Sequence, residues 1–391
     1  MSCVIFGAGK IARGFVGHLL YLSGIEFTFV EKVDALVDLI NERGAYTVNI
    51  LGAPEKNTVV KGARALKFSR GEEISRAIAA ADCIFNAVGG KNLGEIVPFL
   101  TRGIELRAQI NPKPLNIVTC ENWKLPADIL RKGISEAISE ESRAFFEANV
   151  GITEAVIMRS AIEATPDLLE KDPLIVNVQD FWEFPYDASR LKAPMPEGMI
   201  GQKPIYEFTG FLERKFYTYN AANGTTSFVG ALLGYRYIAD AAHDERILKL
   251  LDGVYRETAT ALSKKHNFPF EEQWAFTRTS LNKLRDRNIV DYIERNARDP
   301  MRKLGPDDRL VGSARLCLEY GVKPENLAVA IACAMHYEEP TDEFAVKLAA
   351  LRRDEGYEAI MEKVCHIDPN GELGQLVKEK LAQIKEWGWI Q

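Results

Sequence analysis

The sequence predicts two domains, an open and doubly wound parallel α/β sheet followed by an all-helical domain. Three observations lead to this prediction. The chain has 391 residues, which is more than one hydrophobic core usually serves. Short apolar runs alternate with helical patterns in the first part, which favours a parallel sheet covered on both faces. Beyond about residue 205, the apolar spacing is almost entirely of the helical type.

The expected elements follow from this spacing in chain order. We expect strands at 3–6, 27–30, 83–88, 116–119 and 175–178, a hairpin of 46–51 with 58–60, and helices at 10–22, 33–43, 74–81, 93–107, 247–266, 274–288, 327–335 and 373–387. The run 185–204 is rich in proline and glycine, and we interpret it as a linker or long loop. The expected domains are therefore 1–200 and 201–391.

The composition is that of an ordinary globular protein. Hydrophobic residues make up 47% and charged residues 27%, and the formal net charge is -6 without a basic block. This balance argues against a nucleic-acid-binding protein but allows a small phosphorylated ligand. No apolar run is long enough to span a membrane and no signal-like segment precedes the first strand, so we expect a cytoplasmic protein.

The cysteines and histidines indicate no disulfide framework and no metal site. Six cysteines are scattered along the chain without C-x-x-C spacing, which is typical of buried free thiols in a reducing compartment. The five histidines show no H-E-x-x-H or comparable ligand spacing.

A glycine-rich motif follows the first expected strand and opens the first expected helix. It reads Gly7-Ala8-Gly9-Lys10-Ile11-Ala12, a G-x-G-x-x-A arrangement that is typical of Rossmann-like dinucleotide-binding domains. Gly7 would make the tight turn, Gly9 would let a pyrophosphate approach the backbone, and Ala12 would permit close packing of helix on strand. The helix N-terminus would offer free N–H groups and a positive dipole to the phosphates.

An acidic residue at the end of the second expected strand indicates NAD. Glu31 follows Gly9 by 22 positions, where a carboxylate accepts hydrogen bonds from the ribose hydroxyls and repels the 2′-phosphate of NADP. The neighbouring Lys32 weakens this preference somewhat.

Two later strand ends are expected to complete the cofactor crevice. Ala87 and Val88 lie at the end of one expected strand, and Asn122 follows the next. Ligands of open α/β sheets bind beyond the carboxyl ends of the strands, so these residues belong to the same crevice. Ala87 and Val88 are small enough to pass beneath a nicotinamide ribose.

A lysine and an amide lie among aromatic and small residues in the second part of the chain. The segment runs from Lys215 through Phe216, Tyr217 and Tyr219 to Asn220, and Asn223 follows it. In an α-helix, Lys215, Asn223 and Asn220 would lie at about 0°, 80° and 140° on one broad face. Apolar neighbours would desolvate Lys215 and lower its pKa toward the range where it accepts a proton. Taken alone, however, the segment is better explained as an amphipathic helix with a snorkelling lysine.

Several motifs in a fixed order make the chain resemble a known family. They are Phe6-Gly7-Ala8-Gly9, Ala87-Val88-Gly89, Cys120-Glu121-Asn122, Glu213-Arg214-Lys215 with Asn220, and Arg298-x-Pro300-x-Arg302-Lys303-Leu304 with Asp308-Arg309-Leu310. Over nearly its full length the chain is similar to the polyol-specific long-chain dehydrogenase/reductase family, most closely to members that act on mannitol 1-phosphate.

The resemblance implies an NAD-dependent, metal-independent hydride transfer on a sugar-alcohol phosphate, most closely between D-mannitol 1-phosphate and D-fructose 6-phosphate. Lys215 matches the family's general acid/base, Asn220 matches the asparagine that hydrogen-bonds the reacting oxygen, and Asn122 matches a second amide at that oxygen. Two amide donors aimed at a developing alkoxide would form a small oxyanion hole.

A basic run provides candidate substrate contacts. The run consists of Arg298, Arg302, Lys303 and Arg309, and it accompanies a helix start at which Asp299 suits the cap and Pro300 the first position. Arginines and a helix N-terminus would hold a substrate phosphate well. A solvated basic face, paired with nearby aspartates, explains the run about equally.

Asn223, a further candidate substrate contact, keeps other functions open. The resembled family usually has a histidine there, and an asparagine can donate a hydrogen bond but cannot titrate. The alternatives are a dehydrogenase of another polyol or of a sugar acid of the altronate or fructuronate type, a β-hydroxyacid-type dehydrogenase, and a non-catalytic NAD-binding sensor. Glu213-Arg214, where glycines would be expected, argues against the β-hydroxyacid type, and an intact Lys215 argues against the sensor.

Overall fold

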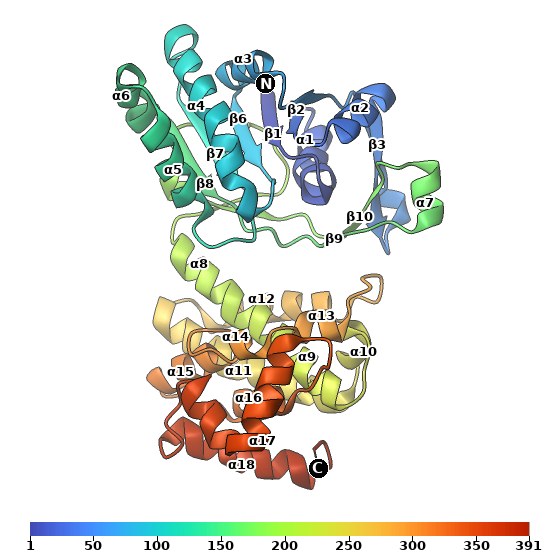
Figure 1. Ribbon diagram of the computed structural model, residues 1–391, viewed down its shortest axis with the longest axis vertical. Coiled ribbons are helices and arrows are strands. Elements are labelled where there is room, and N and C mark those ends of the chain that lie inside the picture. The colour runs from blue at the N-terminus through green and yellow to red at the C-terminus, as the bar shows by residue number, and fades with distance from the viewer. Residues whose placement is uncertain (391) are drawn as a thin grey trace. The chain divides into compact units, whose positions relative to one another are not determined.

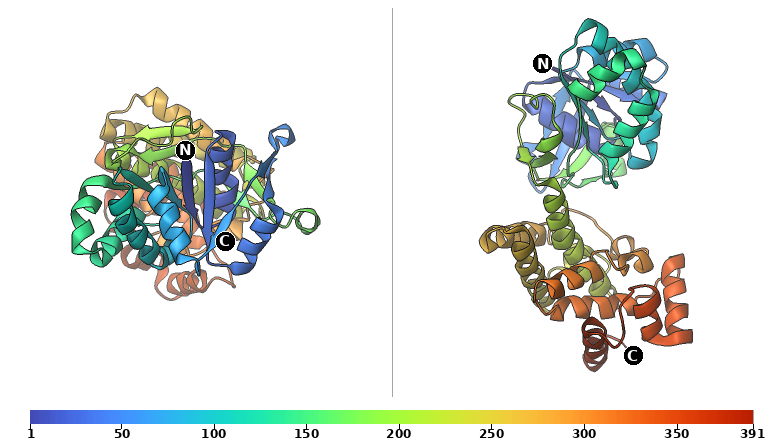
Figure 2. Two further views of the ribbon diagram at one scale, coloured as in Figure 1. Left: turned by 90° about the horizontal axis from the view of Figure 1, so that it is seen from above. Right: turned by 90° about the vertical axis from the view of Figure 1, so that its left-hand side faces the viewer.

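The computed structural model describes residues 1–390. They form two compact units, Met1–Phe208 and Thr209–Gln391. In Figures 1 and 2 the first unit runs from blue to green and the second from yellow-green to red.

The first unit is built on a six-stranded sheet in the order β5-β2-β1-β6-β7-β8. All five pairings are parallel, so the predicted parallel sheet is confirmed. The strands are β1 (Ser2–Phe6), β2 (Glu26–Glu31), β5 (Ala65–Lys67), β6 (Cys83–Asn86), β7 (Leu115–Thr119) and β8 (Val150–Glu154).

Both faces of this sheet are covered, because alternate residues of β1 belong to different cores. Val4 and Phe6 pack in a core with α3 (Gly71–Ala80), α4 (Leu93–Ile110) and α5 (Pro126–Ala137). Cys3 and Ile5 pack in the other core with the helix that follows β1. That helix contains a π-helical stretch, Ala12–Gly17, which continues into α1 (His18–Leu22). The remaining helices of the unit are α2 (Asp34–Arg43), α6 (Glu140–Asn149) and α7 (Pro166–Lys171).

A second, four-stranded sheet lies on the α1 side of the first unit. Its order is β4-β3-β10-β9, with β3 (Ala45–Leu51), β4 (Thr58–Lys61), β9 (Ala161–Ile162) and β10 (Val176–Gln179). The predicted hairpin is confirmed as the antiparallel pair of β3 and β4. The late strand predicted at 175–178 also exists, but it pairs with β3. The second sheet therefore thickens the core around the helix that opens with the glycine motif.

The run 185–204, predicted as a linker or long loop, is not a linker between the two units, and only its middle part, 188–201, is a loop. This run contains the parallel pair β11 (Phe184–Asp187) and β12 (Gln202–Ile205), and Met195 and Met199 are buried in the core of the first unit. Pro185 and Pro204 suggested a loop, but proline is tolerated in a strand that has a free edge. Pro185 still accepts a hydrogen bond from Val156 N through its carbonyl (2.8 Å).

The described residues of the second unit form helices and their connections, with one isolated β-bridge between Tyr237 and Tyr292. The unit begins with α8 (Phe208–Lys215), a π-helical segment (Phe216–Asn220) and α9 (Ala221–Leu232). The later helices are α10 (Ile238–Ala241), α11 (Glu245–His266), α12 (Phe270–Leu284), α13 (Ile293–Ala297), α14 (Pro300–Lys303), α15 (Val311–Glu319), α16 (Glu325–His336), α17 (Glu343–Lys363, kinked at Gly356) and α18 (Glu372–Glu386). An apolar core that includes all of α16 from Leu327 to Met335 joins them.

One predicted helix end in this unit is wrong. The helix expected over 274–288 ends at Leu284. Asp286 accepts a hydrogen bond from Asn288 N (3.0 Å), and such a local side-chain turn competes with continued helix.

Three general expectations concern the whole described chain. All six cysteines are buried free thiols, as predicted. Over residues 1–390, no group of three or more metal-ligating side chains is arranged to hold an ion. Within that same range, every helix is too short or too polar to cross a bilayer.

Candidate active site

The glycine loop after β1 is shaped by close contact with the end of β6. Gly7 has φ +87°, and a Cβ atom there would lie 2.6 Å from the carbonyl oxygen of Ala87. Gly9 faces open space, with no neighbouring atom within 4 Å of an added Cβ. The loop therefore demands glycine at position 7 for its own geometry and leaves room for a ligand at position 9.

The helix that follows the loop lies close to the second sheet. Ala12 is fully buried. The tightest contact is at Gly14, where a Cβ would lie 2.6 Å from Val178 Cγ1 and 2.8 Å from Val176 Cγ1. The buried Arg13 donates a hydrogen bond to the carbonyl of Ala8. Gly14 and Arg13 thus fix the helix beneath the loop.

Glu31 connects the end of β2 to the glycine loop. Its carboxylate accepts hydrogen bonds from Ala8 N (2.8 Å) and Val33 N (3.0 Å). Lys32, the residue that would favour a 2′-phosphate, forms an ion pair with Glu95 of α4 (3.0 Å). Glu95 was not predicted, because it lies far from Lys32 in sequence. The local charge balance favours a coenzyme without a 2′-phosphate.

The glycine loop, the end of β2 and the end of β6 line a common pocket of about 120 Å³. Its lining includes Gly7, Gly9, Glu31, Ala87 and Val88, so the structure brings together five of the six predicted cofactor residues. The pocket lies beyond the carboxyl ends of β1, β2 and β6, where open α/β sheets bind nucleotides.

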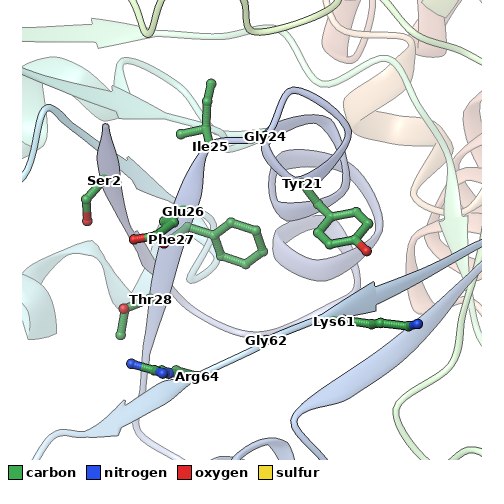
Figure 3. Close-up of a pocket in the computed structure, with 10 residues that line it drawn as sticks. All are labelled: Ser2, Tyr21, Gly24, Ile25, Glu26, Phe27, Thr28, Lys61, Gly62 and Arg64. Carbon is green, nitrogen blue, oxygen red and sulfur yellow. The ribbon is translucent and has the colours of Figure 1, made fainter.

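A larger cavity of the same unit, about 390 Å³, lies at the opposite ends of the strands (Figure 3). Its lining includes Ser2 and Glu26 at the starts of β1 and β2, with Lys61 at the end of β4 and Arg64 just before β5. Its position at the amino ends of the strands separates it from the nucleotide pocket.

The segment after β7 lies against the segment after β6. Glu121 accepts hydrogen bonds from Val88 N (2.8 Å) and Gly89 N (3.1 Å). Burial raises the pKa of Glu121 to about 7, although these two hydrogen bonds oppose the shift. The predicted catalytic residue Asn122 comes next and is exposed on the loop.

In the second unit, Lys215 precedes a π-helical segment, Phe216–Asn220, and Asn220 is the last residue of that segment. The residue after the segment, Ala221, donates its N–H to the carbonyl of Phe216, five positions earlier. In a π-turn the residue at i+5 takes the position that i+4 has in an α-helix. The α-helical angles expected from sequence are therefore wrong, and Lys215 and Asn220 come closer to one face than those angles implied.

The residues before Lys215 anchor this helix to its neighbours. Glu213 forms an ion pair with Lys265 (2.7 Å) and a hydrogen bond with His266 Nε2 (2.6 Å), both on α11. Arg214 pairs with Glu272 of α12 (2.8 Å) and lies between the rings of Phe268 and Phe276. These contacts hold the backbone from which Lys215 projects.

Lys215 lies in a desolvated and positively charged environment. Burial, and after it the charge of Arg309, lowers the pKa of Lys215 below its usual value. Burial and the charge of Lys215 lower the pKa of Lys283 on α12 to about 8. A lysine with a lowered pKa can accept a proton near neutral pH. Sequence reasoning missed Lys283, because only the packing of α12 on the π-helical segment brings it there.

The two asparagines after Lys215 differ in their contacts. Asn220 is half-buried, and its side chain does not cap α9, which starts beside it. Asn223 donates a hydrogen bond to Asn296 Oδ1 (3.1 Å), and Asn296 donates in turn to Asp291 Oδ1 (2.5 Å). Asn223 is therefore fixed within a polar network, while the amide of Asn220 is not engaged by the helix end.

The predicted basic run is divided between surface and interior. Arg298 is exposed, and Arg302 forms ion pairs with Asp299 (3.0 Å) and Asp308 (3.3 Å). Lys303 is buried and donates to the carbonyl of Arg298. Burial, followed by the charges of Arg309 and Arg302, lowers the pKa of Lys303 to about 8. The expected helix start is confirmed, because Asp299 accepts a hydrogen bond from Arg302 N.

Comparison with known proteins gives two family matches that together cover most of the chain. Residues 1–198 match the family model described as the mannitol dehydrogenase Rossmann domain. Residues 207–385 match the mannitol dehydrogenase C-terminal domain.

Two solved structures share this fold. One is D-sorbitol dehydrogenase in substrate-free form, with 15% identity, a TM-score of 0.82, and coverage of 99% of this chain and 93% of that one. The other is Pseudomonas fluorescens mannitol 2-dehydrogenase in a ternary complex with NAD and D-mannitol, with 13% identity, a TM-score of 0.68, and coverage of 100% and 92%.

Proposed function

Because the chain belongs to the mannitol dehydrogenase family, we propose that it is an NAD-dependent oxidoreductase that oxidises a CH–OH group of a sugar-alcohol phosphate. The proposed reaction interconverts D-mannitol 1-phosphate and D-fructose 6-phosphate, which makes the chain a mannitol-1-phosphate 5-dehydrogenase. The observation that carries the proposal is the desolvated Lys215, with Asn220 beside it across one π-turn.

The coenzyme fits the residues of the first unit. Gly9 leaves space for a pyrophosphate, and Glu31 lies where it would accept hydrogen bonds from a ribose. The related mannitol 2-dehydrogenase structure contains NAD. NAD would supply the hydride acceptor for oxidation.

The chain's own residues would handle the proton. Neutral Lys215 accepts the proton of the substrate hydroxyl as the carbon–hydrogen bond breaks, and in the reverse direction the ammonium of Lys215 returns it. The positive charge of Arg309, which lowers the pKa of Lys215, favours the neutral form that oxidation needs. The amides of Asn220 and Asn122 would donate hydrogen bonds to the reacting oxygen as it gains negative charge.

The phosphate of the substrate is assigned to the basic run. Lys303 and Arg302 lie on α14 and Arg309 follows it, so three cations lie close to two carboxylates, those of Asp299 and Asp308. The excess positive charge, with Arg298 at the surface, would favour an anionic group.

A neutral polyol is the second candidate substrate. The ion pairs of Arg302 with Asp299 and Asp308 satisfy this arginine without a phosphate. The relatives of known structure are described as acting on sorbitol and mannitol.

The test is NADH formation at 340 nm with a panel of polyols, sugar acids and their phosphates. The proposal expects turnover of mannitol 1-phosphate and much slower turnover of mannitol. Arg302→Ala should raise KM for the phosphorylated substrate about tenfold, a loss of ~1.4 kcal/mol of binding. Arg353→Ala is the matched control, because Arg353 is also an exposed arginine in an ion pair with an aspartate, Asp354 (2.9 Å).

Equal rates of turnover with mannitol and mannitol 1-phosphate would contradict the phosphate site and favour the neutral polyol as substrate. NADH binding without turnover of any compound in the panel would contradict an enzymatic function and favour a sensor.

A further inference from the structure

We propose that Glu121 is a positioning residue that holds the backbone after β6 in the shape that receives the nicotinamide ribose, and that orients Asn122 at the same time. The inference rests on the proposed use of NAD and adds a residue to that site.

The hydrogen bonds of Glu121 connect two loops at the carboxyl edge of the sheet. Its Oε1 accepts from Val88 N (2.8 Å) and Gly89 N (3.1 Å), and its Oε2 also accepts from Gly89 N (3.1 Å). Val88 follows β6 and Glu121 follows β7. One carboxylate therefore satisfies two consecutive backbone donors that belong to a different strand end.

Other contacts fix the same piece of backbone from its remaining sides. Asn92 donates to the carbonyl of Val88 (2.6 Å). A methyl group added to Gly90 would overlap the indole of Trp123. On the opposite side, Gly7 lies so close to Ala87 that only glycine fits. The segment from Ala87 to Gly90 is thus held between the glycine loop and the segment that carries Glu121, Asn122 and Trp123.

The chemistry of Glu121 indicates that this arrangement serves a ligand. Burial raises the pKa of Glu121, and no cation compensates it in the described part of the chain. Glu121 is half-buried, and an acid that loses water contacts without gaining an ion-pair partner lowers the stability of the fold. Such groups cluster at functional sites, where the cost is offset by the geometry they impose.

The position of Glu121 gives it two effects on a bound cofactor. Val88 lines the nucleotide pocket, so movement of its backbone would change the surface beneath the ribose. Asn122 is the next residue in the chain, so the anchor at Glu121 restricts the direction of the Asn122 amide. Glu121 itself touches neither substrate nor reacting atoms in this account, and it acts through Val88, Gly89 and Asn122.

The experiment compares three variants by NADH fluorescence titration. Glu121→Ala removes the acceptor and should weaken NADH binding at least tenfold, or ~1.4 kcal/mol. Glu121→Gln keeps an amide oxygen that can accept from both N–H groups, so it should bind NADH within about threefold of the wild type, by the same conversion.

Glu257→Ala is the matched control in the helical unit. Like Glu121, Glu257 accepts two consecutive backbone N–H groups, from Asn326 (2.7 Å) and Leu327 (3.0 Å), and its carboxylate is the more buried of the two. Its loss should lower the temperature of unfolding and leave NADH affinity unchanged.

Amide hydrogen exchange supplies a second measurement that needs no cofactor. Val88 and Gly89 should exchange slowly in the wild type and in Glu121→Gln, and fast in Glu121→Ala. Wild-type NADH affinity in Glu121→Ala would overturn the inference, and so would unchanged exchange at Val88 and Gly89. Failure of the wild type itself to bind NADH would overturn the proposed function, while the exchange data would still decide the role of Glu121 in holding the loop.

Discussion

Replacement of Gly9 by alanine should weaken cofactor binding without lowering the stability of the fold. An added Cβ at Gly9 meets no atom within 4 Å, and the backbone there is not left-handed. Alanine in such a position leaves stability unchanged or raises it by ~0.4–1 kcal/mol, because the unfolded chain loses freedom. The same methyl group would occupy the space through which the pyrophosphate approaches the backbone.

Gly7→Ala provides the contrast. Its φ of +87° would cost roughly 1–2 kcal/mol for a residue with a Cβ. The contact of 2.6 Å with the carbonyl oxygen of Ala87 adds about 1–3 kcal/mol of overpacking. Together these costs lower the unfolding temperature by roughly 4–20 °C, at about 2–4 °C per kcal/mol for a domain of this size.

The assay is thermal unfolding of both variants combined with NADH titration. Gly9→Ala should keep the wild-type unfolding temperature and lose at least tenfold in NADH affinity, while Gly7→Ala should lose stability as well. Wild-type NADH affinity in Gly9→Ala would refute the placement of the pyrophosphate at this loop. A large loss of stability in Gly9→Ala would refute the reasoning from open space.

Two further predictions concern charge. Glu95→Gln releases Lys32 from its ion pair and removes one carboxylate near the proposed ribose site. The ratio of kcat/KM for NADP to kcat/KM for NAD should therefore rise about three- to tenfold, consistent with ~1 kcal/mol for an exposed unit charge. An unchanged ratio would contradict this role of Glu95. Lys303 has its pKa lowered to about 8, so its ammonium is lost as pH rises through that value, and KM for the phosphorylated substrate should increase above about pH 8. Lys303→Met should show a high KM that no longer changes with pH near 8. If KM of the wild type and of Lys303→Met changes with pH in parallel, Lys303 does not bind the phosphate.

The sheet and its nucleotide edge were readable from sequence because their signals are local. The alternation of Cys3, Val4, Ile5 and Phe6 directs side chains to two cores, and the structure contains both. The glycine spacing after β1 and the acid at the end of β2 depend on a single strand-helix-strand unit. The sequence prediction failed over 185–204, where Pro185 and Pro204 suggested a linker, because strand pairing between distant residues is invisible in local composition.

The surroundings of the lysine were only partly readable. Lys215 and Asn220 were identified from residue type, but apolar spacing does not distinguish an α-turn from a π-turn, so their angular relation was wrong. Arg309 and Lys283 reach Lys215 through tertiary packing, and Glu95 reaches Lys32 in the same way. Charged groups from other helices shift the pKa of a site residue only because the fold brings them close to it, and a single sequence does not show which helices pack together.

The central claim is that Lys215 moves the proton in an NAD-dependent hydride transfer, and Lys215→Ala tests it most directly. NADH formation at 340 nm from mannitol 1-phosphate should fall by roughly 10²–10⁴-fold, the usual contribution of a general acid/base, while NADH affinity stays within about threefold of the wild type. Retention of most of the activity would contradict the account, and so would loss of NADH binding in proportion to the loss of turnover.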